Sequence, residues 1–130
     1  MAAYEVTDAT PAARSVLIVD DHPSFRRAAR LMLERAGYDI VGESDDAASA
    51  LAAAHRLRPA VVLLDVGLPD RDGVDVAEER CRGDAPPQVV LVSARGAAPY
   101  RRRLETSPAR GFIAKHDLSP ATFRSLVADG

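Results

Sequence analysis

The stretch Val61-Val62-Leu63-Leu64-Asp65 places one carboxylate directly after four consecutive branched apolar residues. A second stretch, Val16-Leu17-Ile18-Val19-Asp20-Asp21, repeats the pattern and ends in two carboxylates. Apolar runs that are short and continuous rather than alternating are typical of parallel strands covered on both faces. The two stretches therefore predict buried strands that carry acidic groups at their carboxyl ends.

Three more apolar runs of this kind occur, and stretches with helical spacing separate all five. The five runs are Val16–Val19, Ile40–Val41, Ala60–Leu64, Val89–Val92 and Phe112–Ala114. Helices are expected from Pro23 to Gly37, after Asp45 and Asp46, from Val74 to Cys81, over Pro99–Glu105, and after Ser119-Pro120. Regular alternation of strands and helices predicts an α/β fold with a parallel, doubly wound sheet.

Composition narrows the class of protein. The chain has 130 residues, of which 47% are hydrophobic and 28% charged, as in an ordinary globular domain. Its net charge of −2 offers no basic field for nucleic acid or for an anionic membrane, and no stretch approaches the length of a membrane span. The one cysteine, Cys81, fits a reducing cytoplasm. Residues 1–14 are expected to form a flexible leader, and residues 15–130 the domain.

Polar residues follow four of the five apolar runs. Asp20 and Asp21 follow the first run, Asp65 the third, Ser93 the fourth and Lys115, the single lysine, the fifth. In open parallel sheets, ligands bind outside the carboxyl ends of the strands, where the strand order reverses. We therefore expect these side chains to converge on one site. The second run, followed by Gly42, Glu43 and Ser44, fits an edge strand away from it.

Three carboxylates in one site need a cation or a proton, because like charges 4 Å apart repel by ~4 kcal/mol at an effective dielectric constant near 20. Carboxylate and carbonyl oxygens suit Mg²⁺. Lys115 and the Ser93 hydroxyl add the positive charge and the donor that a phosphoryl group requires. An ionised aspartate can act as the nucleophile, so the pattern favours metal-assisted acyl-phosphate formation on Asp65.

Two stretches carry a family resemblance. Val16-Leu17-Ile18-Val19-Asp20-Asp21-His22-Pro23 and Leu63-Leu64-Asp65-Val66-Gly67-Leu68-Pro69-Asp70-Arg71-Asp72-Gly73 resemble the response-regulator receiver domain of two-component signalling, particularly its NarL/FixJ-like branch. The resemblance covers residues 15 to about 128. It implies the CheY-like, flavodoxin-like sheet with strand order 2-1-3-4-5 and five helices.

The resemblance also implies roles for individual residues. Asp65 is similar to the phosphoacceptor, and Lys115 to the lysine that bridges to the phosphoryl group. Metal ligands would be Asp21, Asp65 and the carbonyl of Gly67, with Asp20 acting mostly through a metal-bound water. Ser93 and Phe112 resemble the switch hydroxyl and the switch aromatic, which report to the face formed by the fourth helix, the fifth strand and the last helix.

Several of these residues also have a simpler interpretation. Asp20 could cap a strand end, Ser93 could bond only to local backbone, and Phe112 could be ordinary core. We interpret His22 as a loop residue rather than a metal ligand, because one histidine beside carboxylates does not define a metal site. The run Arg101–Arg103 is either a solvated helix face or a surface that contacts a partner.

The fourth helix departs from the family pattern. Pro108 stands where the family has a helix-ending glycine, and Glu105 where a buried small or apolar residue is usual. Proline cannot adopt the left-handed conformation. We therefore expect an irregular or mobile fourth helix, with faster amide exchange over 97–107 than in the first helix.

The function predicted from these features is a phosphorylatable receiver rather than an enzyme. Its expected partners are a sensor histidine kinase or phosphotransfer protein and a downstream protein, with no direct contact to nucleic acid, because no DNA-binding segment precedes Gly130. One alternative is a degenerate receiver that acts without phosphate. Another is a magnesium-dependent aspartyl-phosphate phosphatase, which Gly67 and His22 disfavour because they stand where a haloacid-dehalogenase-type enzyme needs its second aspartate. No glycine-rich nucleotide loop follows the first strand.

Overall fold

A computed structural model describes residues 14–82, 85–96 and 98–127, so the expected leader 1–14 lies almost entirely outside the described residues. The strands are β1 (Ser15–Val19), β2 (Asp39–Ser44), β3 (Val61–Asp65), β4 (Gln88–Ser93) and β5 (Gly111–Ala114). The helices are α2 (Pro23–Arg35), α3 (Ala47–Leu57), α4 (Gly73–Arg80), α5 (Arg101–Thr106) and α6 (Pro120–Leu126), with 3₁₀ turns η1 (Ala98–Tyr100) and η2 (Lys115–Asp117). Within these ranges, none of the helices combines the length and the apolar character that crossing a bilayer requires.

The five strands form one parallel sheet in the order β2-β1-β3-β4-β5, which confirms the predicted fold and strand order. Strand order reverses between β1 and β3, which pair from Val16↔Val61 to Val19↔Leu64. β2 is an edge strand, as expected, but it is longer than the predicted run Ile40–Val41. Its polar residues Glu43 and Ser44 pair with Ile18 and Val19, an extension that apolar character alone does not reveal.

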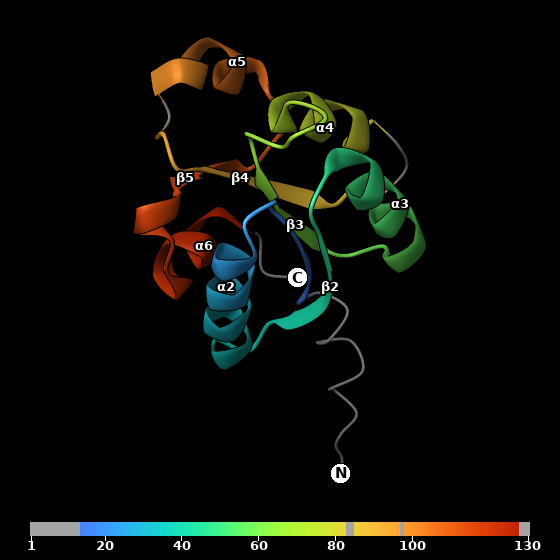
Figure 1. Cartoon of the computed structure of the whole chain (residues 1–130), viewed down its shortest axis with the longest axis vertical. Coiled ribbons are helices and arrows are strands. Elements are labelled where there is room, and N and C mark those ends of the chain that lie inside the picture. Colours follow the sequence, from blue (N-terminus) through green and yellow to red (C-terminus); the bar gives the residue numbers. More distant parts are fainter. Residues whose placement is uncertain (1–13, 83–84, 97, 128–130) are drawn as a thin grey trace.

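Helices cover both faces of the sheet, α2 and α6 on one side and α3, α4 and α5 on the other (Figure 1). Alternate strand residues therefore point into two separate cores. Leu17, Val62 and Leu91 pack toward α3 and α4, whereas Ile18, Leu63 and Val90 pack toward α2 and α6. Strands buried on both faces need apolar residues at every position, which explains the continuous apolar runs.

Local signals in the sequence set where the helices begin. Pro23 occupies the first turn of α2, where its missing N–H costs no hydrogen bond. Asp46, one of the two candidate caps for α3, accepts a hydrogen bond from the Ser49 amide at 2.8 Å. Asp72 caps α4 through the Val74 amide at 2.8 Å. These caps fix the helices at the carboxyl ends of the strands.

The fourth predicted helix is irregular, as expected. It consists of η1 followed by the six residues of α5, none of which is buried. The helix ends at Thr106, and Ser107 is extended (ψ 142°), the conformation that a following proline favours. Its faster amide exchange stays a prediction, and residue 97 lies outside the described part of the chain.

Candidate functional site

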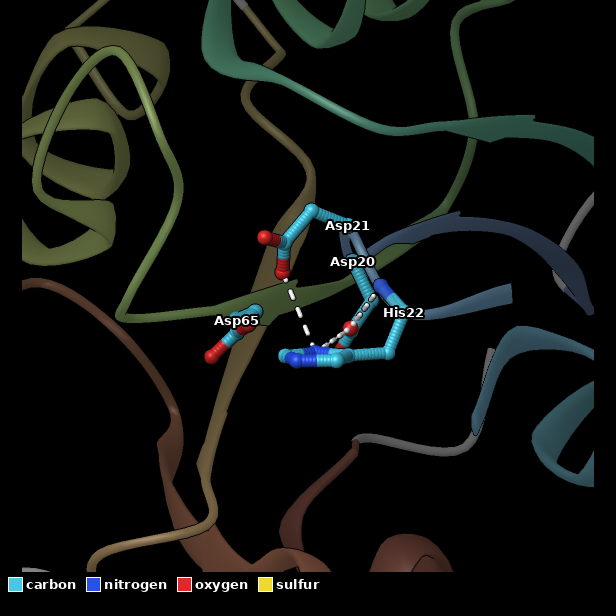
Figure 2. A group of neighbouring side chains, drawn as sticks. All are labelled: Asp20, Asp21, His22 and Asp65. Carbon is cyan, nitrogen blue, oxygen red and sulfur yellow. Dashed lines mark hydrogen bonds and ion pairs between the residues drawn. The ribbon is translucent and has the colours of Figure 1, made fainter. Parts of the chain in front are cut away.

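The carboxyl ends of β1, β3, β4 and β5 bring acidic, hydroxyl and ammonium groups to one cavity of about 300 Å³. The cavity is lined by His22, Asp65, Gly67, Ser93, Ala94, Arg95, Tyr100 and Lys115. Asp20 and Asp21, at the end of β1, lie beside it, and one ligand atom from each of Asp20, Asp21, His22 and Asp65 falls within 4.8 Å of the others. Figure 2 shows the four side chains facing a common space.

Asp20 is the most deeply buried of the acids, with a side-chain exposure of 0%. Its Oδ1 accepts a hydrogen bond from the His22 amide at 2.8 Å. Its Oδ2 forms an ion pair with Lys115 Nζ at 2.7 Å. Asp20 therefore lies at the end of β1, as expected, and the Lys115 ammonium balances its buried charge.

Asp21 has a buried carboxylate oxygen without such a partner. Its Oδ1 is buried and, within the described ranges, accepts no hydrogen bond. Buried anionic oxygens without donors are costly unless a positive charge is close. Three carboxylates, one of them with such an oxygen, form a hard donor set that fits Mg²⁺.

Asp65, at the end of β3, is 4% exposed. Burial raises the pKa of its carboxyl group, and the neighbouring charge of Asp20 raises that pKa further. The Gly67 amide, which donates to Asp65 Oδ1 at 3.1 Å, and the Lys115 ammonium act in the opposite direction. A buried, electrostatically strained carboxylate is a candidate reacting group.

Lys115 follows β5 directly and begins the turn η2. Its Nζ lies 2.7 Å from Asp20 Oδ2 and 3.5 Å from Asp65 Oδ2, so one ammonium contacts two of the acids. The same nitrogen lies 4.7 Å from the centre of the Phe25 ring, a cation–π contact from α2. A compact ammonium on a flexible stem suits this position, which explains why a lysine stands here in an arginine-rich chain.

Ser93 and Phe112 differ in their distance from the acids. Ser93 lines the cavity, and its Oγ accepts a hydrogen bond from the Arg95 amide at 3.0 Å, the local bond considered in the sequence interpretation. Phe112 pairs with Leu91 across the sheet, two residues before Ser93, and packs against the core on the α3–α4 side. It is half-buried and lines a separate surface hollow beside α6.

The loop between β3 and α4 holds Asp65 in place. A Cβ atom on Gly73 would lie 2.3 Å from the Asp65 carbonyl oxygen and 2.7 Å from Val66 Cα, so only glycine fits there. The Gly73 amide donates to the Val66 carbonyl at 2.8 Å, which closes the loop. Further along, Asp70 accepts from the amides of Ala47 and Ala48 and so caps α3.

His22 is the site residue that the sequence interpretation left in a loop. It is the N-cap of α2, and its Nδ1 lies 3.1 Å from Asp20 Oδ1 and 3.1 Å from Asp21 Oδ1 (Figure 2). Arg95, expected beside the acceptor, lines the cavity, and so does Tyr100, which was not predicted. The signal for His22 was its position directly after two strand-end carboxylates, whereas nothing local in the sequence indicates Tyr100.

Comparison with known proteins identifies the family of this arrangement. The family model for the response regulator receiver domain matches residues 16–127. The chain is 35% identical over 102 residues to the Bordetella pertussis virulence transcription regulator BvgA, covering 78% of this chain and 49% of that protein. It is 33% identical to the Escherichia coli nitrate/nitrite response regulator NarP, covering 95% of this chain and 56% of NarP.

The curated relatives are transcriptional response regulators, and this chain spans about half the length of BvgA and NarP. Among solved structures, the receiver domain of the response regulator NarL from Mycobacterium tuberculosis superposes with a TM-score of 0.73 at 31% identity, covering 86% of this chain and 94% of that one. The chemotaxis response regulator CheY4 of Vibrio cholerae, at 23% identity and a TM-score of 0.76, shares the fold. The chain belongs to the response regulator receiver domain family of two-component signalling.

Proposed function

We propose that this domain accepts a phosphoryl group on Asp65 and thereby switches a surface that a partner protein reads. The observation that carries the proposal is the buried Asp65 carboxylate, which lines a cavity together with the Lys115 ammonium and lies beside the carboxylates of Asp20 and Asp21. Family membership supports the same role, because the residues that match the receiver pattern are those that meet at this cavity.

The reaction that fits the site is phosphoryl transfer from a phosphohistidine or a small phosphodonor. One oxygen of ionised Asp65 attacks phosphorus, the new P–O bond forms as the P–N bond of the donor histidine breaks, and the leaving nitrogen takes up a proton. Lys115, 3.5 Å from Asp65 Oδ2, contributes a positive charge beside the incoming oxygens. Ser93, at the rim of the same cavity, offers a hydroxyl donor.

The metal expected here is Mg²⁺, held by Asp21, Asp65 and the carbonyl of Gly67, with Asp20 contributing mostly through a water. A bound Mg²⁺ would neutralise charge on the acids and on the phosphoryl oxygens. The protein itself would keep three carboxylates close enough to share one cation. Burying these charges costs free energy, and the raised pKa of Asp65 reflects that cost. The buried Asp21 Oδ1, which accepts no hydrogen bond from the described residues, supports this assignment.

The switch would act through Ser93 and the surface of α5, β5 and α6. A phosphoryl group adds acceptor oxygens that can draw the Ser93 hydroxyl away from the Arg95 amide, which donates to it at 3.0 Å. Ser93 pairs with Ala114, the residue before Lys115, so a shift there would reach β5 and Phe112. Weak anchoring of α5, none of whose residues is buried, supports its part in the switch.

A sensor histidine kinase or phosphotransfer protein would supply the phosphoryl group, and a downstream protein would read the switch in the cytoplasm. The domain itself would not act as an enzyme on external substrates. No direct contact of this domain to nucleic acid or membrane is proposed.

The decisive experiment is intact-mass spectrometry after incubation with Mg²⁺ and acetyl phosphate or phosphoramidate. We expect one added phosphoryl group, lost in Asp65→Asn and lost on chelation of Mg²⁺. Asp39→Asn, an exposed acid at the start of β2, is the matched control and keeps labelling. Absence of labelling would favour a phosphate-independent interaction module, and multiple-turnover release of phosphate from an ester would favour a phosphatase.

A further inference from the structure

Arg26, near the start of α2, connects the acidic site to the edge strand β2. We propose that Arg26 is a positioning residue of the metal site, which holds the peptide between Asp20 and Asp21 so that both carboxylates face one cation. The inference rests on the metal site of the proposed function. It gives that site a support from β2, the strand that was expected to lie away from it.

The Asp20 carbonyl lies just beyond the paired part of β1. Val19 is the last residue of β1 that pairs with β2 and with β3. Asp20 is fully buried, with an exposure of 0%, and its amide donates to the Ser44 carbonyl at 3.0 Å. A buried carbonyl that lacks a donor costs free energy. Arg26 supplies a donor, because its Nη1 donates to the Asp20 carbonyl oxygen at 2.6 Å.

Arg26 is itself held by Glu43 of β2. Its Nε donates to Glu43 Oε1 at 3.0 Å, and Arg30, one turn further along α2, donates from Nη1 to Glu43 Oε2 at 2.7 Å. The hydrogen bond from Arg30, assisted by that from Arg26, holds the pKa of the Glu43 carboxyl below its ordinary value. Glu43 is therefore a stable anion that fixes one edge of the Arg26 guanidinium.

The planar guanidinium suits this bridge between two partners. Its donors form a rigid fork, so Nε and Nη1 can bond to two different groups at a set angle, whereas a lysine carries one nitrogen on a flexible stem. The Arg26 side chain is only 19% exposed, so little water competes for its hydrogen bonds. The bridge therefore ties the peptide that joins Asp20 and Asp21 to the position of Glu43.

The direction of the effect on Mg²⁺ binding distinguishes positioning from charge. Arg26 brings a positive charge close to Asp20, so if charge were its main contribution, its removal would tighten the binding of a divalent cation. Loss of a group that orients metal ligands instead weakens metal binding, typically by about 10–100-fold. Arg26→Lys keeps the charge and removes the fork, so this variant separates the two effects.

The test is calorimetric titration of the whole chain with Mg²⁺, without a phosphodonor, for the wild type, Arg26→Gln and Arg26→Lys. We expect both variants to lose about tenfold or more of their Mg²⁺ affinity. Arg30→Gln is the matched control, because the hydrogen bonds of Arg30 go to Glu34 and Glu43, and it is expected to change the affinity less than about threefold. A smaller loss in either Arg26 variant, tighter binding, or a loss beyond that limit in Arg30→Gln overturns the inference.

The peptide itself gives a second readout. The ¹⁵N signal of the Asp21 amide reports on the Asp20 carbonyl, because a hydrogen bond to a carbonyl oxygen polarises the amide in the same peptide plane. We expect this signal to shift in both Arg26 variants and to stay in place in Arg30→Gln, and an unshifted signal in the Arg26 variants overturns the inference.

The two proposals fail in different ways. A wild type that binds Mg²⁺ and is labelled on Asp65 by acetyl phosphate, with Arg26 variants of unchanged Mg²⁺ affinity, refutes only the role of Arg26. A wild type that binds no Mg²⁺ or is not labelled refutes the proposed function.

Discussion

The strand ends that carry the acids and the short helix α5 are held by very different forces. Asp20 and Asp65 continue strands whose residues are all buried and paired on both sides within the sheet. In α5, no residue is buried, and Arg103 is tied by ion pairs to Asp72 at 2.7 Å and to Asp75. Exposed ion pairs contribute little, about 0–1 kcal/mol each.

In the proposed function, this difference would separate the phosphoryl chemistry at the strand ends from the signalling surface at α5. The reacting groups need fixed positions, which a buried sheet provides, because cores are packed densely and resist displacement. A surface that signals must change at low cost, and elements with few buried contacts open most readily. The domain therefore combines strand ends that are buried in the sheet with a short helix, α5, that has no buried residue.

The largest effect is expected from Gly73→Ala, which disturbs the backbone around the Asp65 strand end. A Cβ there meets backbone atoms of Asp65 and Val66, which cannot move aside as a side chain can. We expect a loss of about 1–3 kcal/mol or more in the free energy of unfolding, measured by urea denaturation. Gly111→Ala, whose Cβ meets only the flexible side chain of Leu126, is the control and is expected to lose less. Equal losses of unfolding free energy in the two variants would show that the backbone contacts of Gly73 are not what excludes a larger residue.

Asp65→Asn tests the cost of the buried charge. The folded pKa of Asp65 is raised, so as pH rises above the unfolded value the unfolded state ionises first and the native state loses stability. In the presence of a chelator, the variant is expected to be more stable than the wild type at pH 7 by roughly 0.5–2 kcal/mol. The gain should shrink as pH falls through the folded pKa of Asp65 toward the ordinary pKa of an aspartate carboxyl, 3.8. Thermal melts between pH 3.5 and 7 measure this gain in stability. A variant that is less stable than the wild type at pH 7 would contradict the raised pKa of Asp65.

Arg103→Gln tests how weakly α5 is held. Without the ion pairs to Asp72 and Asp75, α5 is expected to exchange its amide hydrogens several-fold faster, while α2 is unchanged and global stability falls by less than ~1 kcal/mol. Hydrogen exchange with mass spectrometry resolves residues 98–106 from 23–35. Arg102→Gln, at an exposed neighbour, is the control. In the wild type too, the amide hydrogens of α5 are expected to exchange faster than those of α2. Equal protection of the two helices would contradict the view that α5 is weakly held.

The smallest effect is expected from Asp70→Asn, at the surface beside the loop. Hydrogen bonds from the Ala47 and Ala48 amides lower the pKa of Asp70, so its ionised form stabilises the native state above the unfolded pKa. That contribution is lost as pH falls through the folded pKa. The variant should lower the melting temperature slightly at pH 7 and converge with the wild type at acid pH. A difference that grows toward acid pH would contradict this.

The family resemblance implied the strand order, which the structure confirms. The apolar runs predicted the groups that meet at the edge of the sheet, because each buried parallel strand shows as a continuous apolar run whose next residue lies at the site. The sequence did not predict features whose position depends on contacts between residues that are far apart along the chain. The polar end of β2, at Glu43 and Ser44, is recognisable only from its partner strand. The cap that Asp70 provides for α3 joins residues 23 apart, and the pairing of Arg103 with Asp72 spans 31. Neither of these two contacts produces a periodic pattern in the sequence.

Because α5 has no buried residue and Arg103 ties it to α4 by exposed ion pairs, part of its attachment depends on the ionic composition of the surroundings. Counterions at physiological strength already screen charges beyond about 8 Å, and concentrated salt shortens that reach to about 3 Å. Brackish or osmotically stressed conditions would therefore loosen this helix while leaving the buried ion pair of Asp20 with Lys115 in place. In the proposed function, dissolved electrolyte would act on the signalling surface without reaching the site of phosphoryl transfer.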